Sequence, residues 1–260
     1  MPNPPTFSIV TCTWNSAATL ADTLASVRAQ TCQAHEHIFV DAGSHDATLD
    51  LLAAYPGNKH VLRDVKGGIG RAMNAGIAAA TGDYIAHLHS DDYYADPSVL
   101  AVVRRCVEQV GAAGRPPAWV FGNIRVLKDG RLLPQNAMRP YSYHSFAAGR
   151  AWIPHPAVFV RRDVFTRVGM FDEGLRYAMD IDLWLRLGAV FRPAMLDRVL
   201  TVFRDHAGSV SSSNRVAARR EEFAVRRRHA GKAPLAFGIY CLRYLKRMHA
   251  LQHRHEEKQT

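Results

Sequence analysis

Short apolar runs alternate with segments of helical spacing along the first hundred residues. The apolar runs are typical of buried strands because each ends in polar or turn-forming residues, and they lie at residues 7–14, 37–44, 59–64 and 83–90. Apolar residues recur at helical spacing between these runs, at residues 16–27, 48–55 and 73–80. This alternation predicts an α/β fold with a mostly parallel sheet and helices on both faces.

The pattern is less regular in the middle of the chain. The elements that we expect there are a helix at 97–110, a hairpin at 118–134 that turns at Asp129 and Gly130, and a strand followed by a helix at 157–171. Arginine becomes frequent from residue 215 onward. We therefore predict an α/β domain over residues 1–214 and a basic helical C-terminal extension over residues 215–260.

A helical count over residues 234–254 places apolar and basic side chains on opposite faces. The expected faces consist of Phe237, Cys241, Leu245 and Met248 on one side and of Arg243, Arg247 and Arg254 on the other. Such a helix suits an anionic membrane surface. It equally suits packing on its own domain or on a second subunit, and both alternatives stay open.

Composition narrows the class of protein. The chain has 260 residues, 48% of them hydrophobic, and can bury one sizeable core. The formal net charge is +10, but the basic residues gather in the last fifth, which disfavours a nucleic-acid-binding sheet. The four cysteines lie far apart without CxxC spacing, which predicts reduced thiols in a cytoplasm-like compartment. We expect neither a signal peptide nor a membrane span, which needs roughly 18 apolar residues in a row.

Acidic residues follow the ends of several predicted strands. Asp41 and the pair Asp91 and Asp92 fall at such ends, where parallel sheets bind their ligands. Adjacent carboxylates repel each other, so the pair indicates either a site for Mg²⁺ or Mn²⁺ or a solvated turn that caps the next helix. The glycine-rich stretch after Lys66 lacks the GxGxxG order of a dinucleotide site, although its amides could face phosphates.

Two later segments contain further candidates. Asp180 begins an apolar helix, where it could cap the helix or, in a dry cleft, take a proton from a hydroxyl. Asp182 is the second choice for that proton transfer. His206 follows a predicted strand and could be structural or a ligand.

Five segments carry a family resemblance: SIVTCTWNS, VDAGSHDAT, GRAMNAGIAAATGDYIAHLHSDD, GMFDEGLRYAMDIDLWLRL and RDHAGSVS. In this order they resemble the inverting nucleotide-sugar glycosyltransferases of family 2, from Phe7 to about Ser213. The resemblance implies a Rossmann-like GT-A fold. It also implies transfer of a sugar from a nucleotide-sugar, with UDP favoured as the nucleotide. The sugar would go to a hydroxyl of a glycan or lipid-linked acceptor, in the biosynthesis of a cell-surface polysaccharide or glycolipid.

The resemblance implies a role for each matching residue at the donor. The residues expected to line the nucleoside pocket are Thr11, Thr13, Trp14 and Asn15. Asp41 would accept a hydrogen bond from the base, and Lys66 stands where the family often contacts the base or a phosphate.

The resemblance also implies a metal site and a base. The aspartate pair corresponds to a DxD-type motif, in which Asp91 would face the ribose or the metal and Asp92 would be the principal ligand of Mn²⁺ or Mg²⁺. His206 matches a late histidine that reaches the metal or the diphosphate. Asp180 matches the catalytic base.

The chain departs from the family pattern at three positions. Met179 precedes the base where the family usually has glutamate, so a supporting carboxylate is missing. Arg71 replaces a frequent aspartate, and His89 replaces a common asparagine. From their position ahead of the base, we expect Trp152 and His155 on the acceptor side.

Two alternatives differ from a glycosyltransferase. A nucleotidyltransferase shares the acidic strand ends, but it needs a glycine-rich stretch near the first strand, and TCTWNSAAT has no glycine. A basic nucleic-acid-binding module is the non-enzyme alternative. We expect a cytoplasmic enzyme without a nucleic-acid partner; a contact of its basic C-terminal helix with the inner face of the cell membrane stays one of the open alternatives. An oligomer remains open.

Overall fold

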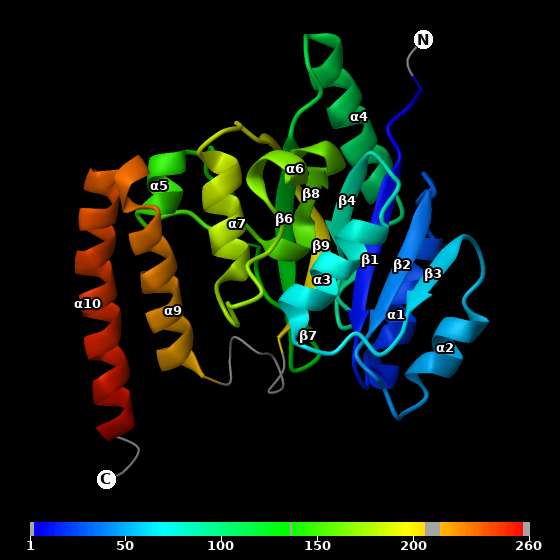
Figure 1. Cartoon of the computed structure of the whole chain (residues 1–260), viewed down its shortest axis with the longest axis horizontal. Helices are drawn as coiled ribbons and strands as arrows, with labels where there is room; N and C mark the ends of the chain where they lie inside the picture. The colour runs from blue at the N-terminus through cyan, green and yellow to red at the C-terminus, as the bar shows by residue number, and fades with distance from the viewer. Residues whose placement is uncertain (1–2, 136, 206–213, 257–260) are drawn as a thin grey trace.

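One sheet organises the protein (Figure 1). The computed structural model describes residues 3–135, 137–205 and 214–256, and nine strands in these ranges form the sheet in the order β3-β2-β1-β4-β8-β6-β9-β5, with β7 paired to β6. The strands are β1 (Phe7–Thr13), β2 (Glu36–Asp41), β3 (Lys59–Leu62), β4 (Tyr84–His87), β5 (Tyr93–Tyr94), β6 (Trp119–Lys128), β7 (Arg131–Leu132), β8 (Val158–Arg161) and β9 (Ala194–Asp205).

The two halves of the sheet differ in strand direction. Strands β1 to β4 pair in parallel, as the alternation of strands and helices predicts. In the other half β8 runs antiparallel to both β4 and β6, whereas β6 and β9 are parallel. The predicted hairpin is confirmed: β6 returns through β7 at Asp129 and Gly130, whose φ angles of 49° and 74° suit a tight turn. The chain thus reaches β8 without a long helical crossover, which permits the antiparallel pairing.

Helices cover both faces of the sheet (Figure 1). Phe7 and Ile9 of β1 point to one face and Val10 and Cys12 to the other, as the alternation of a strand requires. The helices are α1 (Ala17–Arg28), α2 (Thr48–Ala54) and α4 (Val99–Ala112) on the first face, and α3 (Ile69–Ala79), α6 (Phe165–Val168) and α7 (Met179–Gly188) on the second.

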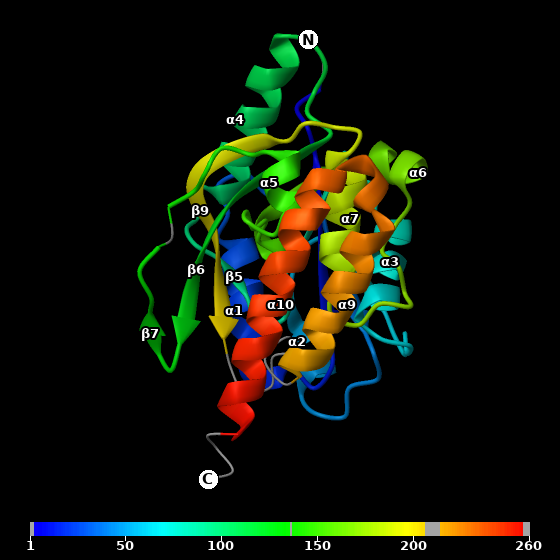
Figure 2. The same cartoon turned by 90° about the vertical axis from the view of Figure 1, so that its left-hand side faces the viewer.

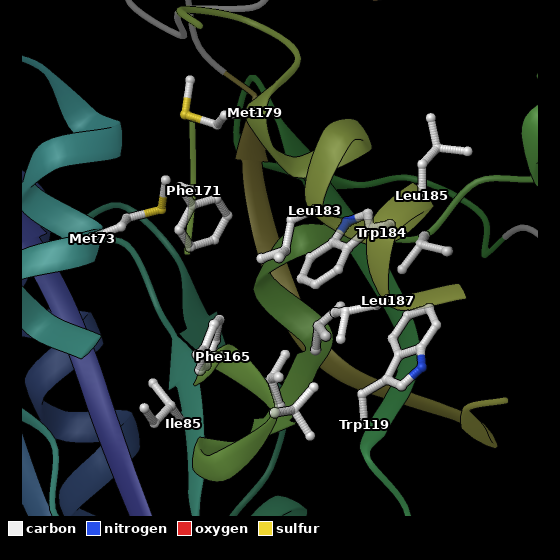
Figure 3. Packing of buried hydrophobic residues seen from close by; sticks show 14 of the residues in the cluster. Met73, Ile85, Trp119, Phe165, Phe171, Met179, Leu183, Trp184, Leu185 and Leu187 are labelled. Atoms are coloured by element: carbon white, nitrogen blue, oxygen red, sulfur yellow. The ribbon is translucent and has the colours of Figure 1, made fainter. Parts of the chain in front are cut away.

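The packing on the second face fixes α3 and α7 against the sheet. Gly76 lets α3 lie close to β1, because a Cβ there would come within 2.3 Å of a methyl carbon of Val10. Trp184 of α7 stacks on Trp119 of β6 at 5.8 Å between ring centroids (Figure 3). Leu183 is fully buried in the same cluster, and burying such a side chain contributes about 2 kcal/mol. This packing also sets the position of the first turn of α7.

The C-terminal extension packs on the rest of the protein. Helices α9 (Arg215–Arg228) and α10 (Pro234–Glu256) lie side by side over α5 (Tyr143–Ala147) and α7 (Figures 1 and 2). Val225 of α9 is fully buried within the same apolar cluster as α7. Tyr240 of α10 is also fully buried and lies beside Phe223. The residues after 214 therefore share the core of the residues before it.

The faces of α10 differ from those of the helical count. The packed side of the helix includes Tyr240 and the partly buried Arg243 and Arg247, although the count placed these arginines opposite the apolar stripe. The most exposed apolar side chains are Leu235, Leu242 and Leu245, with exposed fractions of 85%, 71% and 64%. Aromatic contacts to Phe223 select the packed side, and spacing alone does not reveal them. None of the described helices is long and apolar enough to cross a membrane.

Candidate active site

A cavity of about 820 Å³ opens at the carboxyl ends of β1 and β4. Parallel sheets place their ligands at this edge. The lining comes from the loops after β1 and β4, the start of α3, the segment before α7 and the end of β9, with polar members that include Thr13, Trp14, Asn15, His89, Ser90, Asp91, Asp92, His155, Arg176, Tyr177, Asp180 and Arg204.

The loop after β1 forms one wall of this cavity. Trp14 is 66% exposed, so its indole is available as a stacking surface. Asn15 has a φ of 48° and holds the loop in place: its backbone N–H donates to Ser44 Oγ at 2.9 Å, and its Oδ1 accepts from the backbone N–H of His45 at 2.9 Å. Thr13, Trp14 and Asn15 thus line the cavity, and their contact with a nucleoside stays a prediction.

Asp41 and Thr11 lie behind the lining. Both Asp41 oxygens are bound: Oδ1 accepts from the backbone N–H groups of Gly43 and Ser44 at 2.9 and 2.8 Å, and Oδ2 accepts from the Thr13 hydroxyl at 2.9 Å. Burial alone would raise the pKa of Asp41, but these hydrogen bonds outweigh burial and lower it. Thr11 is fully buried, and its hydroxyl donates to the backbone oxygen of Leu88 at 2.7 Å. Their donor contacts stay predictions; in this structure both residues brace the loops that carry the lining.

Lys66 lies at the surface outside the lining. The side chain is exposed and lies close to Gly43: a Cβ atom added to that glycine would be 3.5 Å from Cε of Lys66. Its contact with a base or phosphate also stays a prediction.

Asp92 is buried beside Arg204. Its exposed fraction is 1%, and Oδ1 accepts from the backbone N–H of Arg204 at 3.0 Å. Oδ2 is buried and has no hydrogen-bond partner within the described ranges. Burial, together with the charge of Asp91, raises the pKa of Asp92 well above its ordinary value. A buried carboxylate oxygen without a donor is the kind of group that a hard cation satisfies.

The residues present fit a divalent cation that shares its coordination with a ligand. Asp91 and Asp92 line the cavity together, and Mg²⁺ commonly takes one or two carboxylates plus phosphate oxygens. The part of the chain that the structure describes contains no group of three or more His, Cys, Asp or Glu residues arranged to hold a metal by itself. His206, the third predicted contact, lies outside the described residues.

Asp180 faces the cavity from the first turn of α7. Its Oδ1 accepts from the backbone N–H of Ile181 at 2.7 Å, and the half-buried residue lines the cavity. Burial raises the pKa of Asp180 to about 6. A base with a pKa just below neutral is ionised at pH 7 and still accepts a proton readily.

Asp182 has a different environment from Asp180. Its two oxygens contact Arg186 Nε at 2.8 Å and His229 Nε2 at 2.9 Å, and the residue is buried outside the cavity lining. This arrangement makes Asp182 a structural ion pair. The structure therefore favours Asp180 over Asp182 as the base.

Two histidines stack at the cavity. The rings of His89 and His155 are 5.2 Å apart and inclined by 9°, and both residues belong to the lining. Burial lowers the pKa of His89, and burial together with the neighbouring imidazoles lowers that of His155, so both rings are neutral at pH 7. Trp152, the other residue expected on the acceptor side, lies outside the lining.

Comparison with known proteins identifies the family. The family profile described as "Glycosyl transferase family 2" matches residues 8–152. An uncharacterized glycosyltransferase of Mycobacterium tuberculosis is 34% identical over 206 residues, which cover 78% of this chain and 76% of that protein. This chain belongs to glycosyl transferase family 2. It is therefore an enzyme that transfers a sugar, which favours the first interpretation over a nucleotidyltransferase or a nucleic-acid-binding module.

A second relative and a solved structure extend the comparison. The PGL/p-HBAD biosynthesis glycosyltransferase of Mycobacterium bovis is 30% identical over 209 residues, covering 76% of this chain and 75% of that protein. The crystal structure of S. aureus TarS 1-349 in complex with UDP-GlcNAc matches with a TM-score of 0.72 at 20% identity, over 87% of this chain and 66% of that one. This structural match confirms the GT-A fold. A longer TarS structure is covered to only 39%.

Sequence patterns did not single out Arg204 as a residue of this cavity. Arg204 lines the cavity and joins three segments: its Nε donates to the backbone oxygen of Asp91 at 3.1 Å, and its Nη2 donates to Asp22 at 2.7 Å. The segment FRDHAGSVS contains Arg204, but the motif drew attention to the histidine two residues later. The register that pairs Tyr93 of β5 with Val202 of β9 brings Arg204 to the aspartate pair.

Proposed function

We propose that this family 2 glycosyltransferase transfers a sugar from a nucleoside diphosphate sugar to an acceptor hydroxyl, with inversion at the anomeric carbon. One observation carries the proposal: Asp91, Asp92 and Asp180 come from separate segments and line one cavity. An acidic pair that suits a diphosphate-bound cation thus shares a site with a carboxylate that suits a general base.

The nucleoside would bind against the loop after β1. Trp14 offers an aromatic face there, and Asn15 fixes the loop through its hydrogen bonds to the loop after β2. The structural neighbour TarS was crystallised with UDP-GlcNAc and with UDP. These observations support uridine as the base of the donor.

Asp91 and Asp92 would hold Mn²⁺ or Mg²⁺ on the diphosphate. When bound, the cation neutralises the charge that develops on the departing nucleoside diphosphate. Arg204 fixes Asp92 through its backbone N–H, so the buried carboxylate keeps Oδ2 available. The guanidinium of Arg204 places a positive charge at the same wall of the cavity.

Asp180 would act as the general base. Its carboxylate takes the proton of the acceptor hydroxyl while that oxygen attacks the anomeric carbon on the face opposite the leaving diphosphate, which inverts the configuration. The apolar neighbour Met179 lines the cavity beside it. The elevated pKa of Asp180 agrees with this role.

The acceptor would be a hydroxyl of a glycan or a lipid-linked saccharide in cell-surface biosynthesis. The name of the PGL/p-HBAD relative supports a glycolipid pathway. Exposed Leu235, Leu242 and Leu245 on α10, with Lys246 beside them, offer an apolar and basic contact for an anionic membrane surface. Such a contact would bring the enzyme to a lipid-linked acceptor.

A donor screen tests the proposal. Purified protein is incubated with Mn²⁺ and a panel of nucleoside diphosphate sugars, and release of the nucleoside diphosphate is measured with and without lipid-linked acceptors. We expect release from UDP-sugars above the other nucleotides, and loss of release after chelation of the metal. Metal-independent release, or equal release from every nucleotide, would contradict the proposal.

A further inference from the structure

A carboxylate from the C-terminal extension binds the segment in front of the base. Glu221 of α9 accepts from three successive backbone N–H groups: its Oε1 lies 3.0 Å from Arg176 N, 2.5 Å from Tyr177 N and 2.7 Å from Ala178 N. Its Oε2 lies 3.0 Å from Arg176 N as well. Consecutive N–H groups form a concave site for an anion, and hydrogen bonds to a charged acceptor are stronger than neutral ones.

This contact lies next to the cavity. Arg176 and Tyr177 belong to the lining, and Ala178 is the residue from which α7 begins, two positions before Asp180. Alanine provides no side-chain cap for α7. The bond to α9 therefore adds to the packing of Trp184 and Leu183 where a side-chain cap is missing.

Further contacts from the end of α9 reach residues on both sides of the segment 176–178. Arg228 Nη1 donates to Asp172 Oδ2 at 2.8 Å, and His229 at the end of the helix contacts Asp182 at 2.9 Å. Val225, one helical turn after Glu221, is fully buried in the shared core. Helix α9 thus holds the segment from residue 172 to residue 182 along its length.

We propose that Glu221 is a positioning residue for sugar transfer, because it fixes the backbone of residues 176–178 directly in front of the base. The inference rests on the proposed function, in which Asp180 is the general base. It links α9, which lies outside the cavity lining and outside the family-matched residues 8–152, to the backbone in front of the base. The C-terminal extension then has a task besides the membrane contact proposed for α10.

The test compares Glu221→Gln with Glu108→Gln. Both changes remove one negative charge from a helix, but Glu108 is exposed on α4, far along the chain from the site. Hydrogen exchange at the amides of residues 176–178 reports the contact without any requirement for activity. Turnover, donor affinity and the dependence of kcat on pH report its effect on the base.

We expect Glu221→Gln to speed exchange at these three amides by about tenfold or more, since charge-assisted bonds are lost. We expect kcat to fall by about tenfold to a hundredfold at nearly unchanged donor affinity, because small misplacements of a reacting group have effects of that size. The acidic limb of the kcat profile should move to lower pH, because a loosened Asp180 gains water and its pKa falls towards the ordinary value. Glu222 and Arg226, the charged residues of α9 that act on the pKa of Asp180 in opposite directions, are unchanged in this variant. Glu108→Gln should match the wild type in all three measurements.

Two results would overturn the inference while the wild type transfers sugar. One is a Glu221→Gln protein with faster exchange but wild-type kcat and pH profile. The other is a variant that only melts at a lower temperature, with kcat per folded molecule and the pH limb unchanged. A wild type that transfers sugar from no donor is a separate result: it defeats the proposed function, and this inference falls with it.

Discussion

The backbone N–H of Arg204 donates to Oδ1 of Asp92 at 3.0 Å and leaves the second oxygen of that carboxylate without a partner among the described residues. The two residues lie on β9 and after β4, more than a hundred positions apart in the chain. The bond holds a buried carboxylate in one orientation. It therefore explains how an acidic group can stay ready for a cation inside a largely apolar wall.

Asp92→Asn should remove metal-dependent donor binding. The amide keeps an oxygen for Arg204 but loses the charge that attracts the cation. For the wild type, UDP at a hundred times its Kd in Mn²⁺ should stabilise the fold by about 2.7 kcal/mol, and the variant should lose this stabilisation. Thermal melting with and without UDP and Mn²⁺ measures the effect.

Asp197→Asn serves as the control for that experiment. Asp197 is exposed on β9, so the change removes the same charge from the same strand outside the cavity lining. The control should respond to UDP as the wild type does. Equal stabilisation of Asp92→Asn and Asp197→Asn would show that Asp92 does not hold the metal.

Turnover should rise with pH through about pH 6. Burial raises the pKa of Asp180 to about 6, and the base works only when its carboxylate is ionised. Activity is therefore lost as the pH falls through this value. Rates measured at saturating donor from pH 4.5 to 8 check this rise of turnover with pH. A flat profile across pH 5 to 7 would rule out Asp180 as the titrating base.

Asp182→Asn should weaken the fold more than the chemistry. The change breaks a buried ion pair and leaves Arg186 and His229 without their charged partner, which costs about 3 kcal/mol. Turnover per folded molecule should stay far above that of Asp180→Asn. Urea unfolding and initial rates measure the two effects. A variant with full stability but without turnover would show that Asp182, and not Asp180, is the base.

Leu242→Ser with Leu245→Ser should reduce binding to anionic vesicles. Both leucines are exposed on α10, so the change removes apolar contact area while the packed side of the helix stays intact. Val190→Ser, which alters another exposed apolar residue, is the matched control. Sedimentation with vesicles that contain phosphatidylglycerol measures the difference, and undiminished binding of the double variant would defeat the membrane contact.

Periodicity predicted the parallel half of the sheet because each apolar run from Phe7 to Leu88 is short and is separated from the next by a helical segment. It could not predict the antiparallel pairing of β8, since strand direction depends on how the chain returns after the hairpin. The packed side of α10 was also missed, because Phe223 on α9 selects it through contacts that spacing does not contain.

For the candidate site, too, the sequence predicted some of the residues and missed others. Strand ends and family motifs pointed to Thr13, Asp92 and Asp180, which line the cavity. The supporting groups, Arg204 and Glu221, lie far along the chain and carry no local signal. Long-range packing brings them to the site, so only the structure reveals them.

Separating binding from chemistry in Asp180→Asn tests the central claim most directly. Donor affinity is measured by calorimetry with UDP and Mn²⁺, and turnover is measured with the best donor and acceptor. The account predicts an unchanged Kd for UDP and a fall in kcat of about a hundredfold to ten-thousandfold, the usual effect of removing a general base. Wild-type turnover in this variant would contradict it.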